Sequence, residues 1–327
     1  MNHKLSGAGA SEPGSRGGAA NQTRGIVLAG SSYLIWGFLP LLFAALAPAG
    51  AAEIIGQRVL WSAVWCLAIL AACGRLRDLA VLARDRQALV GISLCAALLG
   101  VNWFAHVAGI MTGRVVEAGI GYLLNPLVSV LLGVWALHES LRPVQWLGVG
   151  LAIIAVGLAG AGYGRFPWVA IILPLSWSAY SLVKKRLRLP VGVMAAFTAE
   201  MVMLVPLAGA LLIALGASPL GTSSLGGPSG LRTVLTIATG LATAVPLLAF
   251  NSAARMTKLA TLGMLQYLSA SCQILLGALY FGEPMPPARL AALVLVIAAL
   301  AVFTVGGLGA TRKPSPATRQ IGVAHVR

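Results

Sequence analysis

The chain has 327 residues, of which 58% are hydrophobic and only 9% charged. Soluble domains carry about 25% charged residues and single cores stop growing at roughly 250–300 residues, so this composition excludes an ordinary soluble protein and indicates a lipid bilayer as the solvent. A formal net charge of +15 would favour nucleic acid as a partner in a soluble protein, but the basic residues lie between apolar runs and form no single stripe.

The first 24 residues are rich in Gly, Ala and Ser and carry three basic residues, Lys4, Arg16 and Arg24. They contain no short apolar segment of the signal-peptide type. We therefore expect residues 1–24 to form a disordered, uncleaved cytoplasmic tail, with the first apolar run as the membrane-targeting signal. Residues 309–327 are expected to form a second cytoplasmic tail.

Ten apolar stretches follow, each near the length of about 20 residues that a helix needs to cross the hydrocarbon core. The third contains Asn102 and His106, and the sixth is bounded by Arg165 and Lys184. The sequence therefore predicts an all-α integral membrane protein with ten transmembrane helices. The predicted spans are residues 25–47, 53–73, 88–110, 117–137, 144–162, 165–183, 191–215, 231–253, 260–280 and 287–308.

The basic residues orient these spans, because Lys and Arg in short loops favour the cytoplasmic side. With a cytoplasmic N-terminus, 18 of the 23 Lys and Arg residues fall in inner segments. Arg58 lies within the second span, and four residues lie outside, namely Arg114, Arg165, Arg232 and Arg289. This distribution predicts a multi-pass protein of the cell (inner) membrane with cytoplasmic N- and C-termini, and it explains the basic pI without any nucleic acid.

The sequence repeats part of itself at a distance of 144 residues. Glu139 aligns with Glu283 and Pro143 with Pro287, within matches that run from the fourth span into the fifth and from the ninth into the tenth. A repeat of five spans forces the second copy to enter the membrane in the opposite orientation, which is an architecture of secondary transporters. We therefore predict two inverted five-helix repeats, residues 25–162 and residues 163–308.

Prolines inside the predicted spans favour a bent bundle. Each proline removes a backbone donor and can kink its helix, although proline is common in membrane helices and any single one has that simpler explanation. Together they favour a bundle that encloses a cavity. These prolines are Pro40, Pro126, Pro174, Pro206 and Pro246.

Small and polar residues recur every four positions along the fourth span and place a stripe on one helical face. Such a stripe has two explanations of equal weight: close helix packing, or the lining of a solute pathway. Four residues on or beside the paired stripes are candidates for that lining, namely Tyr122, Asn125, Gln266 and Tyr267. The stripe consists of Glu117, Gly121, Asn125, Ser129 and Gly133, and its counterpart in the ninth span is Thr261, Leu265, Ser269, Gln273 and Gly277.

Several carboxylates have structural explanations. Glu139 and Glu283 each precede a proline by four residues, where an anion favours the N-terminus of the next helix. Glu117 lies three residues after Arg114, which predicts an ion pair on one helix. Glu53 and Arg58 open the second span, and Arg58 must face protein or water at that depth.

Glu200 is the most informative acid because it lies about 13 Å inside the seventh span by the helical rise. No basic residue lies within reach on the same helix. A carboxyl in that position is either a proton-coupling group or a neutral glutamate that is hydrogen-bonded to a neighbouring helix. Glu53 and Glu117 are the other candidates for proton coupling.

The chain lacks the motifs of an enzyme or an ATP-driven pump, since no catalytic triad, metal-binding helix or phosphate loop is present. The cysteines show no paired spacing, and His106 is expected to be a packed, hydrogen-bonded imidazole. We therefore expect no catalytic residue, no metal and no cofactor.

Motifs along residues 24–310 resemble the RarD branch of the EamA family, within the drug/metabolite transporter superfamily. The first half contributes Tyr33-x-x-Trp36-Gly37, Glu53-Ile54, Arg58-Val59, Asn102-Trp103, Glu117-Ala118, Gly121-Tyr122, Asn125-Pro126 and Gln145-Trp146. The second half contributes Glu200, Pro206, Val245-Pro246-Leu247, Gln266-Tyr267 and Gly282-Glu283. One departure is an extended Gly, Ser and Pro loop, residues 216–230, to which we assign no function.

The resemblance implies a ten-helix secondary transporter that exports small organic solutes, with Arg58, Asn102 and Trp103 added to the candidates for the substrate pathway. We expect a small metabolite or drug-like compound as substrate, either with or without proton coupling. The expected partners are that small molecule and the lipid bilayer, as a monomer or a homodimer, without nucleic acid. The alternative is a non-transporting membrane scaffold or regulatory protein, which would not need Arg58, Asn102 or Glu200 at depth.

Overall fold

The computed structural model describes residues 13–137, 143–216, 230–256 and 259–308. Within these residues the chain is helical and contains no strand. The helices are α1 (Pro13–Ala44), α2 (Ala51–Ala72), α3 (Arg77–Arg84), α4 (Arg86–Met111), α5 (Val115–Leu137), α6 (Pro143–Tyr163), α7 (Trp168–Arg186), α8 (Val193–Ala214), α9 (Gly230–Met256), α10 (Leu259–Leu275), the π-helical turn η1 (Leu276–Tyr280) and α11 (Pro287–Leu308).

Each predicted span coincides with one long helix, and six of these helices are long and apolar enough to cross a membrane. The six are α2, α4, α8 and the apolar parts of α1, α6 and α9. Shorter apolar stretches lie in α5, α7 and α11, at Val115–Ser129, Trp168–Lys184 and Pro287–Val302. The chain is therefore a multi-pass membrane protein.

Two expectations about connecting segments need correction. Residues 13–24 are helical and extend α1, where we expected a disordered tail, because Pro13 suits the first turn of a helix and no residue after it interrupts the turn. The basic segment after the second span was expected to be a loop and contains the short helix α3, with Leu82 buried on its inner face. The expected tails 1–12 and 309–327, and most of the loop 216–230, lie outside the described residues.

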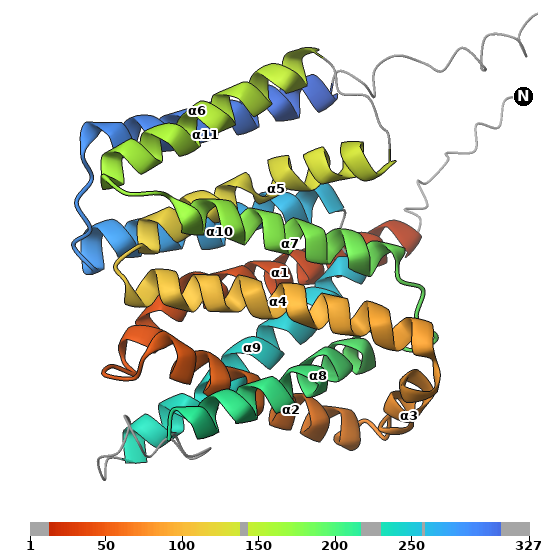
Figure 1. Ribbon diagram of the computed structural model, residues 1–327. Helices are drawn as coiled ribbons and strands as arrows, with labels where there is room; N and C mark the ends of the chain where they lie inside the picture. Colours follow the sequence, from red (N-terminus) through yellow and green to blue (C-terminus); the bar gives the residue numbers. More distant parts are fainter. Residues whose placement is uncertain (1–12, 138–142, 217–229, 257–258, 309–327) are drawn as a thin grey trace, which may run out of the picture.

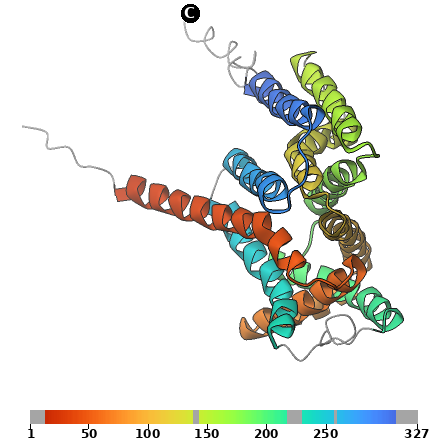
Figure 2. The same cartoon turned by 90° about the vertical axis from the view of Figure 1, so that its left-hand side faces the viewer.

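Apart from α3, successive helices run in alternating directions across Figure 1. The beginning of α1, the helix α3 and the end of α11 consequently lie at the same end of the bundle, on the right of the view. Figure 2 shows α6 and α11 together at the top, with α2 and α9 at the bottom. The bundle thus has a central group of helices with the α6–α11 pair set to one side.

The packing pairs are reciprocal between the two halves of the chain. Helix α1 packs against α9 and α10, while α7, the first helix of the second half, packs against α4 and α5. Likewise α2 packs against α8 and α9, and α8 packs against α2 and α4. The pairs α5–α10 and α6–α11 join corresponding helices directly. Exchanging the two halves therefore preserves the largest contacts, whereas the smaller α2–α4, α1–α4 and α5–α11 contacts have no counterpart of similar size.

Glycines allow the halves to approach closely at several crossings. At Gly240, a Cβ atom would lie 2.4 Å from the backbone carbonyl carbon of Trp61, so α9 passes directly over α2 there. At Gly37, it would lie 2.7 Å from the Cβ of Cys272, where α1 crosses α10. Helices in lipid associate through such close packing because lipid tails are as apolar as the helices themselves.

We predict that Gly240→Ala destabilises the bundle, because the added methyl group has no room against the Trp61 backbone. Overpacking of this kind costs about 1–3 kcal/mol. The detergent-solubilised variant should therefore melt several degrees below the wild-type protein in a thermal aggregation assay. Gly209→Ala on α8 is the control, since its Cβ would meet nothing within 4 Å. Equal melting temperatures for the two variants would show that the α2–α9 contact is looser than described.

Candidate functional site

A cavity lies among eight of the long helices, between the two halves of the chain. The space between its walls, counted together with the part that is open to the surroundings, is about 740 Å³. Helices α6 and α11 contribute no residue to it. The lining consists of Tyr33, Trp36, Leu39, Arg58, Leu99, Asn102, Trp103, His106, Tyr122, Asn125, Trp177, Tyr180, Phe197, Thr243, Leu247, Gln266, Ser269 and Gln273.

Arg58 is the charged residue of this lining and is only 3% exposed. Its Nε donates a hydrogen bond to Thr243 Oγ1 over 2.9 Å, from α2 to α9. Its guanidinium lies 4.2 Å from the ring centre of Trp103 and 5.5 Å from that of Phe43, both within cation–π range. These contacts fix the direction of the guanidinium and attract its charge toward the aromatic faces.

Polar side chains from α4, α5 and α10 form another part of the wall. Asn102 donates from Nδ2 to the carbonyl oxygen of Leu173 and to Ser176 Oγ, both at 3.0 Å. His106 Nε2 lies 3.2 Å from Gln273 Oε1. Asn125 is 1% exposed, and neither Nδ2 nor Oδ1 has a hydrogen-bond partner among the described residues. The amide of Asn125 is therefore the polar group of this wall that is not engaged by the protein.

Aromatic side chains supply most of the remaining wall. Tyr33 and Trp36 on α1 meet edge to face, with ring centres 5.6 Å apart. Trp177 and Tyr180 on α7 have ring centres 5.7 Å apart. Aromatic faces of this kind bind apolar or aromatic groups, so the cavity combines an apolar wall with one cation and several amide groups.

Six of the seven residues predicted for the substrate pathway line this cavity, and they lie on α2, α4, α5 and α10. They are Arg58, Asn102, Trp103, Tyr122, Asn125 and Gln266. The seventh, Tyr267, does not line it and packs instead against the core between α5, α6 and α11. Their role in transport stays a prediction. His106 is hydrogen-bonded as expected, and it also lines the cavity.

Sequence reasoning missed several lining residues, chiefly the aromatic ones. Trp177 and Tyr180 were not singled out, and Tyr33 and Trp36 entered only through the family motif. In an apolar helix an aromatic residue has the same pattern whether it faces lipid, core or cavity. The available signal was the concentration of Trp and Tyr beside prolines in the first and sixth spans.

The stripe on α5 serves both purposes that were left open. Gly121 packs against α7, where a Cβ would lie 3.2 Å from the Cα of Ala170, and Ser129 Oγ lies 2.9 Å from Ser178 Oγ. Asn125, between them, reaches the cavity. Close packing therefore accounts for most of the stripe, and the cavity lining accounts for one of its members.

Glu200 has partners that a single helix could not reveal. Lys184 Nζ lies 2.9 Å from Glu200 Oε1, and the Tyr180 hydroxyl donates to Oε2 over 3.0 Å, both from α7. The sequence offered no basic residue within reach on the same helix, and the structure supplies a basic partner from the preceding helix. Glu200 is 1% exposed while the Lys184 side chain is 26% exposed, and Tyr180 connects the pair to the cavity wall.

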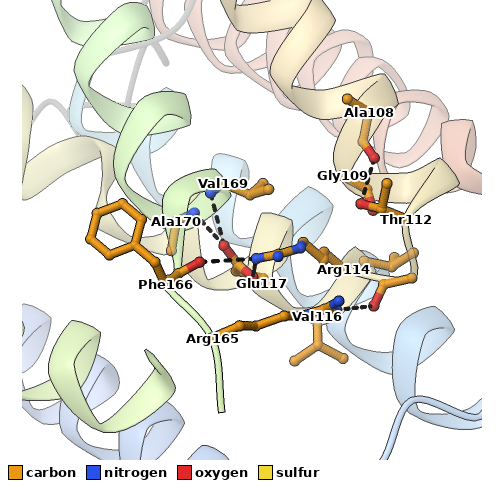
Figure 3. A network of polar contacts seen from close by, with 12 residues as sticks. Ala108, Gly109, Thr112, Arg114, Val116, Glu117, Arg165, Phe166, Val169 and Ala170 are labelled. Atoms are coloured by element: carbon orange, nitrogen blue, oxygen red, sulfur yellow. Dashed lines mark hydrogen bonds and ion pairs between the residues drawn. The ribbon is translucent and has the colours of Figure 1, made fainter. Parts of the chain in front are cut away.

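Glu117 binds the beginning of another helix (Figure 3). The expected ion pair with Arg114 is confirmed at 3.0 Å. In addition, Glu117 Oε1 accepts from the backbone N–H groups of Val169, at 2.8 Å, and Ala170, at 3.3 Å, in the first turn of α7. An anion at a helix N-terminus is stabilising, and this one joins α5 to α7.

Glu283 binds the N-terminus of α5, which differs from the role that we expected. We placed it at the N-terminus of the following helix, α11, but it accepts hydrogen bonds from the backbone N–H groups of Val115 and Val116. Burial raises the pKa of the Glu283 carboxyl, although those two N–H groups act in the opposite direction. Glu139, its counterpart in the first half, lies outside the described residues. Glu53 is buried in the first turn of α2 and does not line the cavity.

We predict that cysteines at Asn125 and Gln266 react with a water-soluble thiol reagent in a background that lacks the native cysteines. Both positions line the cavity, whereas Leu127 on α5 packs in the hydrophobic core and does not line it. A cysteine at Leu127 should react roughly tenfold more slowly or not at all, because reaction requires access of the reagent to the thiolate. Tyr267→Cys should resemble the Leu127 control. Equal inertness at Asn125 and Gln266 would show that the cavity is closed to water.

Comparisons with known proteins agree with this arrangement. The model of the EamA-like transporter family matches residues 23–161, nearly the first predicted half. Protein RarD of Streptomyces exfoliatus is 40% identical over 299 residues, 90% of this chain and 93% of that protein. An uncharacterized transporter of Pseudomonas aeruginosa is 37% identical over 298 residues, 91% of this chain and 99% of that protein. One crystal structure shares the fold, with a TM-score of 0.56 and 20% identity over 87% of this chain and 98% of that one. Similarity of this extent places the chain in the RarD subfamily of the EamA-like transporter family of membrane proteins.

Proposed function

We propose that the protein is a secondary transporter of the inner membrane that exports a small organic metabolite or drug-like compound. The observation that carries this proposal is the central cavity, which eight helices from both halves of the chain line with one arginine, several amides and aromatic side chains. In secondary transporters the substrate site lies near the midplane between two repeats. The name of the Pseudomonas aeruginosa relative, a transporter, supports the same class.

The proposed architecture is ten spans in two inverted repeats, residues 25–162 and 163–308. The reciprocity of the largest contacts between the two halves supports it, because a two-fold exchange of the repeats relates α1–α9 to α4–α7 and α1–α10 to α5–α7. The beginning of α1 and the end of α11 lie at the same end of the bundle in Figure 1, which supports an even number of crossings. Alternating access would then consist of movements of one repeat against the other around the cavity.

The proposed orientation places both termini in the cytoplasm. The short helix α3 and the connection from α7 to α8 carry many of the basic residues and lie at the end of the bundle where α1 begins. Because basic segments stay on the inner side, this end is the cytoplasmic one.

Topology can be tested through exposed positions at the two ends. Cys73, an exposed residue at the end of α2, should react with an impermeant thiol reagent only in inverted vesicles. Phe166 is 70% exposed before α7, and Phe166→Cys in a background without native cysteines should react in intact cells. Reaction of both thiols from the same side would contradict the proposed topology. Reporter fusions at Thr311 and within 216–230 fall outside the described residues and should report opposite sides as well.

We further propose that transport is coupled to protons through Glu200. In the structure its carboxylate joins α8 to α7 through Lys184 and Tyr180, and Tyr180 lines the cavity. A proton on Glu200 removes the attraction to Lys184, so protonation and the position of α7 beside the cavity are linked. Glu117 is committed to the N-terminus of α7, which favours Glu200 over Glu117 as the coupling group.

The test of coupling compares Glu200→Gln with Asp85→Asn in proteoliposomes. Gln keeps the shape of Glu200 and one of its two acceptor oxygens but cannot ionise, so an imposed pH gradient should no longer drive accumulation, while exchange between equal substrate pools continues. Asp85 accepts from the N–H groups of Gln87 and Ala88 at the start of α4, and Asn also serves as an N-cap, so this control should retain pH-driven flux. The substrate for the assay comes from comparing exported metabolites of cells with and without the protein.

Three outcomes would contradict parts of the proposal. Undiminished pH-driven uptake by Glu200→Gln would remove Glu200 from the mechanism and leave a uniporter, or coupling through Glu53. Loss of folding in Glu200→Gln, restored by replacing Lys184 with Met in addition, would identify a structural ion pair. No difference in exported metabolites and no flux in proteoliposomes would contradict transport itself and favour a scaffold.

A further inference from the structure

We infer that the solute that enters the central cavity is a small organic anion of the carboxylate class, with an aromatic or apolar body, and that Arg58 binds its charged group. This inference rests on the transport function proposed above and narrows its substrate. It follows from what the protein leaves unpaired in the cavity and from the chemistry of the surrounding wall.

The first observation is the incomplete pairing of the Arg58 guanidinium. A guanidinium has five N–H donors and never loses its charge in proteins. The Nε group donates to Thr243, whereas Nη1 is buried and has no hydrogen-bond partner among the described residues. Arginine is well suited to bind a carboxylate through two parallel hydrogen bonds, and part of this capacity is unused.

The second observation is the missing counter-charge. Ion pairs join Arg75 to Asp78, Arg114 to Glu117 and Lys184 to Glu200 among the described residues, and none of these pairs includes Arg58. A cation at membrane depth is costly unless it is paired or faces water. The Trp103 and Phe43 rings compensate only part of that cost, because a ring quadrupole is a weaker partner than a carboxylate. An anionic ligand would supply the charge that the protein omits.

The third observation is Asn125, which lines the same cavity with an unpaired amide. Whichever way its oxygen and nitrogen are assigned, the group offers one acceptor and two donors. Buried polar groups normally find partners, so an amide that faces a cavity without one is suited to a ligand. Asn125 can therefore donate to a carboxylate oxygen or accept from a neutral hydrogen-bonding group of the solute.

The aromatic wall of the cavity favours an organic acid over an inorganic anion as the ligand. Tyr33, Trp36, Trp103 and Trp177 surround the polar groups, so a small inorganic anion would leave most of the lining in contact with no ligand group. The neighbouring Lys184–Glu200 pair is neutral as a whole, so it does not cancel the charge of Arg58. One cation in an aromatic cavity matches a monoanion with an apolar body.

The first experiment measures binding to the purified full-length protein by calorimetry. The probes are phenylacetate, indole-3-acetate and octanoate, each compared with its uncharged amide. Because charge-assisted hydrogen bonds are the stronger ones, at least one carboxylate should bind about tenfold tighter than its amide. The inference is wrong if every amide binds as well as its acid, or if no carboxylate binds.

The second experiment assigns the preference to Arg58. Arg58→Gln should remove the difference between acid and amide, and Arg58→Lys should restore part of it, since Lys keeps the charge but not the bidentate geometry. Arg77→Gln, at the start of α3 and away from the cavity, is the control that should keep the preference. If Arg58→Gln does not fold, Thr243→Val provides the test, because it removes the acceptor that orients Nε. It should weaken carboxylate binding and leave amide binding unchanged. The assignment is overturned if the folded Arg58→Gln variant still prefers the acid over its amide. If Arg58→Gln does not fold, the same preference in Thr243→Val overturns it.

Flux measurements distinguish a failure of this inference from a failure of the proposed transport function. Proteoliposomes that move carboxylates in an Arg58-dependent manner support both. If they move neutral or cationic compounds equally well in wild type and Arg58→Gln, transport stands and the anion inference fails. If Arg58-dependent binding occurs without flux of any compound, the binding site stands and the transport function fails.

Discussion

Backbone N–H groups at the beginnings of helices need hydrogen-bond partners, and within an apolar bundle few partners are available. Carboxylates from other segments meet this requirement at the end of the bundle where α5 and α7 begin. Glu117 on α5 accepts from the first turn of α7, and Glu283 after η1 accepts from the first turn of α5. A chain of two carboxylates thus connects the end of α10 to α5 and α5 to α7, across both halves. The cavity walls on α5 and α7 depend on these connections for their position.

The central cavity combines features that separately would destabilise a membrane bundle. Arg58 lies at depth without a carboxylate partner among the described residues, and Asn125 has an unpaired amide. Both lie among aromatic residues that fill space without neutralising charge. Polar groups that a protein leaves unpaired in its interior are expected where a ligand completes them, and among the described residues Arg58 and Asn125 are the cavity-lining residues of this kind.

The sequence predicted the helical segments well because their signal is local. An apolar run has a measurable length, and each predicted span holds a long helix. Most of the cavity candidates could also be predicted from the sequence, since Asn125 and Arg58 are polar residues in apolar surroundings. Contacts between helices could not be predicted from the sequence. The Lys184 partner of Glu200 and the α5 partner of Glu283 depend on which helices are neighbours, and no periodicity within one segment encodes that. Aromatic residues such as Trp177 were missed because an aromatic side chain in an apolar helix can face lipid, the core or a cavity equally well.

The pair formed by α6 and α11 lies outside the ring of helices around the cavity. These helices join the two halves through small buried residues such as Ala155 and Ala299, while large residues including Ile153 and Ile297 point outward. The helices α6 and α11 therefore add a contact between the halves that is separate from the cavity, beside the contacts that the cavity-lining helices make with one another. Sequence drift on the outer pair can adapt the protein to a new lipid environment without altering what the cavity accepts. Changes on the inner helices can diversify ligand chemistry while the outer pair continues to hold the halves together.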